Sequence, residues 1–244
     1  LQKNDIRCFY TMSYFQYPTG VSYSIEKKKR ILELAEIYDF YIIEDDYLSE
    51  LIYENSMEYI PFKWLDTNDR VIYIKSFSKI FLPGIRLGYM IAPECYRESI
   101  QSSKHNTDIT TSSLMQRSLQ MYIQEGKWRE NIKVLNDEYR KRYTLMKEIL
   151  DNDFKDIASY MDPKGGLNFY VILNDKNINT KDLFRALKKK GIYITPGAML
   201  FTKESNGQDA FRLAFYQTND DKIIRGMKIL KEEILKQSVV SALK

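Results

Sequence analysis

A lysine in the segment Ser76-Phe-Ser-Lys79 is the residue of this sequence best placed for covalent chemistry. The stretches Val71 to Ile74 and Leu87 to Ala92 on either side have the branched and aromatic residues typical of β-strands. Pro83 and Gly84 mark a turn between them. A lysine at the mouth of a buried sheet is expected to lose hydration, which favours its neutral amine as a nucleophile toward carbonyl groups. The segment therefore predicts Schiff-base chemistry at Lys79.

Donors for a phosphate group lie close to this lysine in the sequence. Ser76 and Ser78 carry hydroxyls, and Arg86 carries a planar guanidinium whose paired N–H groups match phosphate oxygens. A surface turn with a solvated lysine is the commoner explanation of such a short motif, because short motifs often match by chance. The interpretation as a cofactor site therefore depends on what else the chain brings to this place.

Two earlier parts of the chain are expected to supply more polar groups to the same place. Ile6 to Tyr10 predicts a strand that leads into the loop Tyr17-Pro-Thr-Gly20, and Phe40 to Ile43 predicts a strand that ends in Glu44-Asp-Asp-Tyr47. Strands that alternate with helical crossovers predict an α/β fold with a mostly parallel sheet, which binds ligands at its carboxyl edge. We therefore expect the loop and the acidic cluster to lie at the same sheet edge as Lys79.

These residue types together suit pyridoxal phosphate (PLP). This cofactor needs a lysine for covalent attachment, a carboxylate beside its pyridine nitrogen, a phenol near its ring hydroxyl, and donors for its phosphate. Lys79 would supply the amine, Asp45 or Asp46 the carboxylate, and Tyr47 the phenol. The serine hydroxyls and the guanidinium described above would hold the phosphate.

Composition excludes several other kinds of site. The single histidine, His105, and the widely separated Cys8 and Cys95 exclude most histidine-based catalysis and zinc binding. The net charge of +4 is modest and the lysines are scattered, so we expect no nucleic-acid binding by this chain itself. No apolar run reaches the roughly 20 residues of a membrane span, and no signal pattern opens the chain. We expect a cytoplasmic location and no membrane contact.

Changes of pattern along the 244 residues predict three parts. Residues 1–126 are expected to form part of a large PLP-binding α/β domain. Residues 127–150 predict one long, highly charged helix, and residues 151–244 predict a small C-terminal α+β domain. We expect the tail from Ser238 to Lys244 to fray. Because the chain reaches a strand within a few residues of Leu1, we expect that an N-terminal part of the protein precedes it.

Hydrophobic periodicity and capping residues predict the remaining elements. Ser24 is the expected N-cap of the first helix, whereas Tyr53 to Asp69 shows little periodicity and is expected to be connecting structure. The predicted strands in the second half are 167–173, 193–195 and 210–215, and the predicted helices are 25–38, 93–104, 110–124, 127–150, 181–190 and 220–236.

The chain resembles the class I/II, fold-type I PLP-dependent aminotransferases. The resemblance covers nearly the whole chain in the right order. It rests on Tyr17-Pro-Thr-Gly20, Glu44-Asp-Asp-Tyr47, Ser76-Phe-Ser-Lys79 with Pro83-Gly-Ile-Arg-Leu-Gly-Tyr89, Gly165-Gly-Leu167, and Phe211-Arg-Leu-Ala-Phe215. The family's ring-stacking aromatic residue and first phosphate-binding loop would lie upstream of Leu1, so we expect this chain to carry only part of the cofactor pocket.

The resemblance implies a role for each candidate residue. Lys79 would be the catalytic, Schiff-base lysine, Asp45 the partner of the pyridine nitrogen, and Tyr47 the donor to the ring oxygen. Arg212 would bind the substrate carboxylate through its bidentate guanidinium. The implied cofactor-binding set is Tyr17, Asp45, Tyr47, Ser76, Ser78, Lys79 and Arg86.

Details favour one branch of this family. Gln16-Tyr-Pro-Thr-Gly20 and Asp45-Asp-Tyr-x-x-Glu50 are most similar to the aminotransferase-like domain of MocR-type regulators in the GntR group. In such regulators a DNA-binding domain precedes the PLP domain, and the cofactor senses an amino acid or amine. DNA would then be bound only through a domain absent from this chain. The resemblance also implies a homodimer.

Two alternatives remain open at this point. The chain could belong to an active aminotransferase that transfers an amino group between an amino acid and a 2-oxo acid, with Lys79 moving the substrate's α-proton. It could also be a cofactor-free dimerisation module. The sequence does not identify the amino compound.

Overall fold

The computed structural model of this protein describes residues 6–54, 56–203 and 205–242. The chain divides into two compact units. Unit 1 comprises Leu1–Gln16 and Ser22–Asn136, and unit 2 comprises Tyr17–Val21 and Asp137–Lys244. Each candidate residue can therefore be assigned to one unit.

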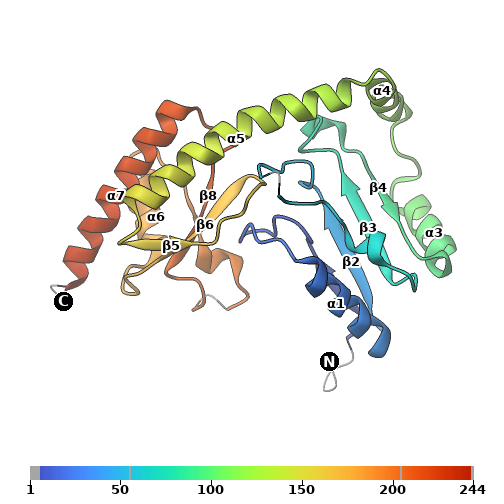
Figure 1. Cartoon of the computed structure of the whole chain (residues 1–244), viewed down its shortest axis with the longest axis horizontal. Coiled ribbons are helices and arrows are strands. Elements are labelled where there is room, and N and C mark those ends of the chain that lie inside the picture. The colour runs from blue at the N-terminus through green and yellow to red at the C-terminus, as the bar shows by residue number, and fades with distance from the viewer. Residues whose placement is uncertain (1–5, 55, 204, 243–244) are drawn as a thin grey trace. The chain divides into compact units, whose positions relative to one another are not determined.

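Unit 1 is built around a mixed four-stranded sheet with the order β1-β2-β3-β4 (Figure 1). Its first three strands are parallel and β4 is antiparallel to β3, which confirms the predicted α/β class with a mostly parallel sheet. The strands are β1 (Cys8–Thr11), β2 (Tyr41–Asp46), β3 (Val71–Ser76) and β4 (Gly88–Ile91), and the helices are α1 (Ile25–Ile37), α2 (Phe62–Leu65), α3 (Arg97–Asp108) and α4 (Ser113–Gln124).

The local signals in the sequence explain how unit 1 folds. Ser24 caps α1 as predicted, because its side chain accepts a hydrogen bond of 3.2 Å from the backbone N–H of Lys27. A buried apolar cluster of Ala35, Phe40, Ile42, Phe62 and Val71 then joins α1 and α2 to the parallel strands. The helices therefore cover one face of the sheet and fix the strands that carry the site.

Strands β2 and β3 are longer than the sequence predicted. We expected them to end at Ile43 and Ile74, before the polar residues, but the parallel ladder continues to the pair Asp46 and Lys75. The burial of β2 alternates residue by residue up to Asp46. Polar side chains can remain inside a strand when they find partners there, so the acidic cluster belongs to the strand itself.

Unit 2 contains a four-stranded antiparallel sheet with the order β5-β6-β8-β7, consistent with a small α+β fold. Its core includes stacked rings of Tyr143 and Phe169, 5.5 Å apart, and Phe215 packs 5.7 Å from Phe169. The strands are β5 (Ala158–Tyr160), β6 (Asn168–Leu173), β7 (Thr195–Pro196) and β8 (Ala210–Ala214). The helices are the second part of α5 (Lys127–Asp153), α6 (Thr180–Lys188) and α7 (Asp220–Ala242).

Several boundaries in the second half differ from the prediction. The division between the units falls inside α5, between Asn136 and Asp137. Strand β5 is absent from the predicted elements because its three residues are too few to show a period. The prediction of a frayed tail from Ser238 is wrong as far as Ala242, since α7 continues to that residue. Residues 243–244 lie outside the described part. No helix among the described residues is long and apolar enough to cross a membrane.

Candidate functional site

The carboxyl ends of β2 and β3 lie side by side in unit 1. Asp45 pairs with Ile74 and Asp46 with Lys75 in the parallel register, so Tyr47 and Ser76 follow at the same edge of the sheet. Parallel strands present the residues after them at one edge, which is where α/β sheets bind ligands. The structure therefore brings the predicted acidic cluster next to the predicted lysine loop.

Aromatic packing fixes the loop that carries Lys79. Phe81 lies against Tyr122 of α4, with ring centroids 4.3 Å apart, and Phe77 packs on the same small cluster as Leu119. The backbone N–H of Phe81 donates to the carbonyl of Phe77 at 3.0 Å. The apolar residues of the loop are thus turned toward α4, and the side chain of Lys79 is exposed. The predicted loss of hydration at this lysine is not found in unit 1, because its apolar neighbours pack on the helix.

The return of the chain into β4 brings the phosphate donors together. Arg86 adopts a left-handed backbone conformation with φ of 50° after the turn at Pro83. Its Nη1 donates to the Ser78 hydroxyl at 3.4 Å, and the Ser78 N–H donates to the Ser76 hydroxyl at 3.3 Å. Two hydroxyls and a guanidinium therefore converge within one loop, as a phosphate site requires.

Asp45 has a partner that the sequence analysis missed. The hydroxyl of Tyr10 on β1 donates a hydrogen bond to the Asp45 carboxylate. Burial and this carboxylate raise the pKa of the Tyr10 phenol, which therefore stays protonated as a donor. Tyr10 pairs with Ile43 in the ladder, and Ile43 and Asp45 share a face of β2, so strand alternation was the signal that could have identified it.

Asp46, on the opposite face of β2, has its carboxylate bound by other side chains of unit 1. Its carboxylate accepts hydrogen bonds from the phenols of Tyr59 (2.5 Å) and Tyr73 (2.6 Å) and lies 3.1 Å from the ammonium of Lys75. Burial by itself raises the pKa of this carboxyl, but the charge of Lys75 and the phenol donors outweigh it and hold the pKa below its ordinary value. Of the two carboxylates that the sequence left open, Asp45 is therefore the better candidate for a cofactor.

Unit 2 holds the other two candidate residues, and it brings them into contact. The guanidinium of Arg212 on β8 lies 5.0 Å from the ring centroid of Tyr17, within the range of a cation–π contact. Its Nη2 donates to the hydroxyl of Thr195 on β7 at 3.1 Å. Asn168 on β6 holds the Tyr17 loop through a hydrogen bond of 2.8 Å to the carbonyl of Pro18. Tyr17 thus belongs to the surroundings of Arg212, and its part in cofactor binding stays a prediction.

Two buried polar atoms close to this contact have no hydrogen-bond partner among the described residues. They are Nε of Arg212 and the hydroxyl of Tyr170, and the two residues pair directly across β8 and β6. Buried donors without partners are rare in folded proteins, and a bound ligand is one explanation for them. This part of unit 2 is therefore suited to an anionic group.

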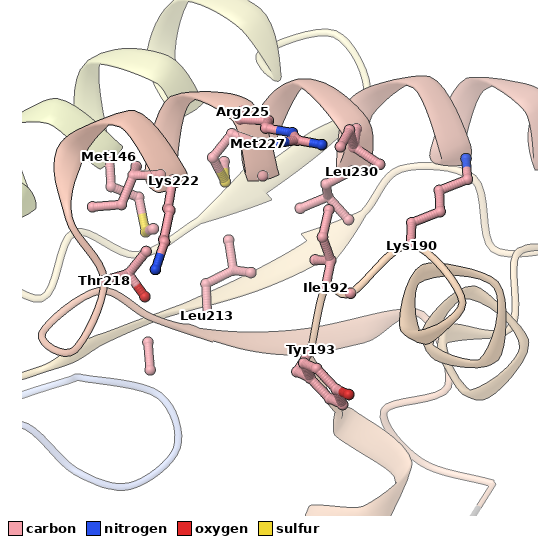
Figure 2. A pocket seen from close by; sticks show the side chains of 15 residues that line it. Met146, Lys190, Ile192, Tyr193, Leu213, Thr218, Lys222, Arg225, Met227 and Leu230 are labelled. Atoms are coloured by element: carbon pink, nitrogen blue, oxygen red, sulfur yellow. The ribbon is translucent and has the colours of Figure 1, made fainter.

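A separate cavity of about 470 Å³ lies in unit 2 beside α7, and Figure 2 shows Lys222 and Thr218 at one end of it. Leu213 and Met227 form part of its apolar lining. None of the predicted site residues lines this cavity. Its size alone assigns it no role.

The comparisons with known proteins fit this geometry. The model of the family described as aminotransferase class I and II matches residues 3–229. This chain belongs to that family. The family resemblance read from the sequence motifs is thereby confirmed.

Relatives of two kinds match the chain. The aromatic-amino-acid aminotransferase 1 of Thermococcus litoralis is 31% identical over 229 residues, 94% of this chain and 54% of that protein. The kynurenine aminotransferase of Pyrococcus horikoshii, solved in complex with PMP, has a TM-score of 0.91 and 32% identity and covers 97% of this chain and 58% of its own. The uncharacterized HTH-type transcriptional regulator YdfD of Bacillus subtilis is 32% identical over 197 residues, 81% of this chain and 40% of that protein.

The chain is thus an aminotransferase-like domain related to both aminotransferases and HTH-type regulators. It spans only about half the length of the relatives that it matches.

Proposed function

We propose that this chain is the PLP-binding, effector-sensing part of a transcriptional regulator of the GntR/MocR type. The observation that carries the proposal is the cluster at the ends of β2 and β3, where Asp45 and Tyr47 adjoin the loop from Ser76 to Lys79. The relationship to HTH-type regulators supports the regulatory part of the proposal. The PMP bound to the Pyrococcus horikoshii relative supports a pyridoxal-type cofactor.

The residues present in unit 1 fit such a cofactor by the chemistry of their side chains. When bound, PLP supplies an aldehyde that reacts with amines and a pyridine ring that withdraws electrons. Lys79 is exposed and can reach a carbonyl carbon, and Asp45 can keep a ring nitrogen protonated. Tyr47 can donate to a ring oxygen.

Phosphate binding falls to the donors at the start of the loop. Arg86 and Ser78 are already within 3.4 Å of each other, so little ordering remains when an anion binds between them. Ser76 adds a further hydroxyl next to Ser78.

Arg212 is the proposed carboxylate binder for the amino ligand. Thr195 holds one of its nitrogens and the Tyr17 ring lies near the guanidinium, so the side chain is oriented before a ligand arrives. Its buried Nε has no partner among the described residues and can donate to a carboxylate oxygen.

Borohydride reduction of the full-length protein tests the cofactor. With PLP added, we expect a yellow protein and a reduced label on Lys79 by peptide mapping, which Lys79→Ala abolishes. Lys104→Ala, which removes an exposed lysine paired with Asp108, is the matched control and should keep the label. A label that persists in Lys79→Ala would refute the assignment, and no label in the wild type would favour the cofactor-free dimerisation module.

Replacement of Arg212 separates substrate from cofactor. We expect Arg212→Ala to weaken the spectral change caused by amino acids while PLP affinity stays near the wild-type value. Arg185→Ala removes an exposed arginine of unit 2 paired with Asp182 and serves as control. An equal loss of both responses in Arg212→Ala would mean that Arg212 is structural.

An active aminotransferase is the second candidate. The 31% identity to the Thermococcus litoralis enzyme favours it, since that identity extends over 94% of this chain. Steady turnover of an amino acid and a 2-oxo acid by the full-length protein would establish it against the pure sensor, for which we expect at most one turnover.

The partners follow from the same proposal. We propose an amino acid or amine as effector, a homodimer as the assembly, and a cytoplasmic location. DNA would be bound through a domain absent from this chain. Light scattering of the full-length protein tests the dimer.

A further inference from the structure

A buried ion pair joins the two strand ends that carry the proposed cofactor residues. Lys75 on β3 lies opposite Asp46 on β2 in the ladder, and their side chains are 6% and 5% exposed. We infer that Lys75 is a positioning residue, which fixes the ends of β2 and β3 and so presents Asp45 and Ser76 to the cofactor. This inference rests on the proposed function.

The ammonium of Lys75 lies among polar groups from the end of β2 and the segment after it. Its Nζ lies 3.1 Å from Asp46 Oδ1, 2.7 Å from Glu50 Oε1 and 2.9 Å from the hydroxyl of Ser49. The ammonium donates hydrogen bonds to Ser49 and Glu50 and forms an ion pair with Asp46. One side chain of β3 thereby holds both the end of β2 and the turn that follows it.

The charges of these groups hold the ends of β2 and β3 together. Asp46 is buried and Glu50 is partly buried, and Lys75 is a cation that contacts both carboxylates. The phenols of Tyr59 and Tyr73 stabilise Asp46 further, but they carry no charge. Loss of Lys75 would leave two carboxylates close together without that cation. The strand ends would then separate or admit water, because either change reduces the repulsion between the two negative charges.

The pair lies next to functional residues on both strands. Asp46 stands between Asp45 and Tyr47, and Lys75 directly precedes Ser76. Successive residues of a strand point to opposite faces, so anchoring Asp46 on the buried face sets the direction of Asp45 on the other. The carbonyl of Lys75 is also closely approached by Gly88 of β4, where a Cβ would lie 2.5 Å from it. The end of β3 is therefore held from both sides.

The test compares Lys75→Met with Lys75→Arg, which keeps the charge, in the full-length protein. Lys63→Met is the matched control, because Lys63 also pairs with two carboxylates, Asp66 and Asp69, but near the start of β3 and away from the carboxyl ends of the strands. Hydrogen exchange without PLP is measured over residues 41–50 and 71–82, with α1 as the internal reference. PLP affinity and the pH dependence of its absorption band are measured in parallel.

We expect Lys75→Met to speed exchange at both strand ends at least about tenfold while α1 is unchanged. We expect it to weaken PLP binding by about tenfold and to shift the pH midpoint of the absorption band. Lys75→Arg should bring the exchange rates and the PLP affinity to within about threefold of the wild-type values. Lys63→Met should change neither the exchange rates nor the PLP affinity.

Unchanged exchange at both strand ends, or a uniform increase over all of unit 1, would overturn the inference. Normal PLP binding by Lys75→Met would also overturn it. If Lys75→Met does not fold, Glu50→Gln gives the same test, since it removes one of the two carboxylates and should raise exchange at residues 41–50. If the wild type binds no PLP, the proposed function fails, while the exchange result still decides whether Lys75 orders the strand ends.

Discussion

Lys28 and Lys75 are both buried in unit 1, at 0% and 5% exposure, but their surroundings differ. Lys75 contacts the carboxylates of Asp46 and Glu50. Lys28 instead donates to the carbonyl of Ile60 at 2.7 Å, with its ammonium 3.8 Å from the centroid of the Tyr14 ring. Two lysines of similar burial therefore have different partners, which are carboxylates for Lys75 and a backbone carbonyl with an aromatic ring for Lys28.

The pKa of Lys28 reflects its burial. Burial lowers it to about 8 from its ordinary 10.5, although Glu44 and Asp46 raise it in part through their charge. Lys79, the lysine proposed for chemistry, is exposed in unit 1 and so differs from both of these buried lysines. The lysine proposed for chemistry is thus distinguished by its place in the loop after β3 rather than by burial.

The largest effect is expected from removing the ion-paired lysine. Lys75→Met should lower the free energy of unfolding by about 3–5 kcal/mol, because it leaves buried carboxylates without their cation. Urea unfolding followed by circular dichroism measures the change. Lys28→Met removes a buried lysine that contacts no carboxylate among the described residues and is expected to cost far less. Equal losses in the two variants would contradict the comparison.

Lys28 should contribute a rise of stability with pH at pH values below those at which tyrosines begin to ionise. Between about pH 8 and 10 the unfolded chain still holds the Lys28 proton while the folded chain has lost it, so Lys28 makes the free energy of unfolding rise with pH. Above pH 10 the raised pKa values of the Tyr59 and Tyr73 phenols act in the opposite direction, because only the unfolded chain loses those protons. Below pH 8 both states are protonated and the cost of the buried charge is constant. The rise should amount to at most about 3 kcal/mol. Urea unfolding at several pH values measures it, and a Lys28→Met variant that keeps the full rise would contradict the assignment.

A backbone contact provides a smaller test of the Lys75 region. Gly88→Ala places a Cβ 2.5 Å from the Lys75 carbonyl oxygen, so we expect a loss of about 1–3 kcal/mol from overpacking. Gly84→Ala is the matched control, because no atom lies within 4 Å of its added Cβ. Thermal unfolding that shifts equally in both variants would show that the contact at Gly88 carries no special cost.

The smallest effect is expected on the more open face of the sheet. Tyr10→Phe removes the hydrogen bond to Asp45, but Tyr10 is 55% exposed and water can replace it. We expect the free energy of unfolding to change by no more than about 0.5 kcal/mol in urea titrations. A loss as large as that of Lys75→Met would mean that the two faces of β2 do not differ in the way described.

Much of the fold could be predicted because its signals are local. The N-cap at Ser24, the apolar strands and the turn at Pro83 each depend on a few neighbouring residues, and all are found. The ends of β2 and β3 could not be predicted, since the polar residues there are retained by partners far away in the sequence. Tyr59 and Lys75 reach Asp46 across 13 and 29 residues, and no local pattern indicates such contacts.

The candidate site shows the same division. The sequence by itself determined the types of residue that a PLP site needs and the order of the motifs, because reactive side chains and turns are specified residue by residue. Only the tertiary structure showed that Asp46 is bound by Tyr73 while Tyr10 reaches Asp45, and that Tyr17 lies against Arg212. The physical reason is that pairing across strands fixes which face a side chain occupies, and burial then demands partners that any part of the chain can supply.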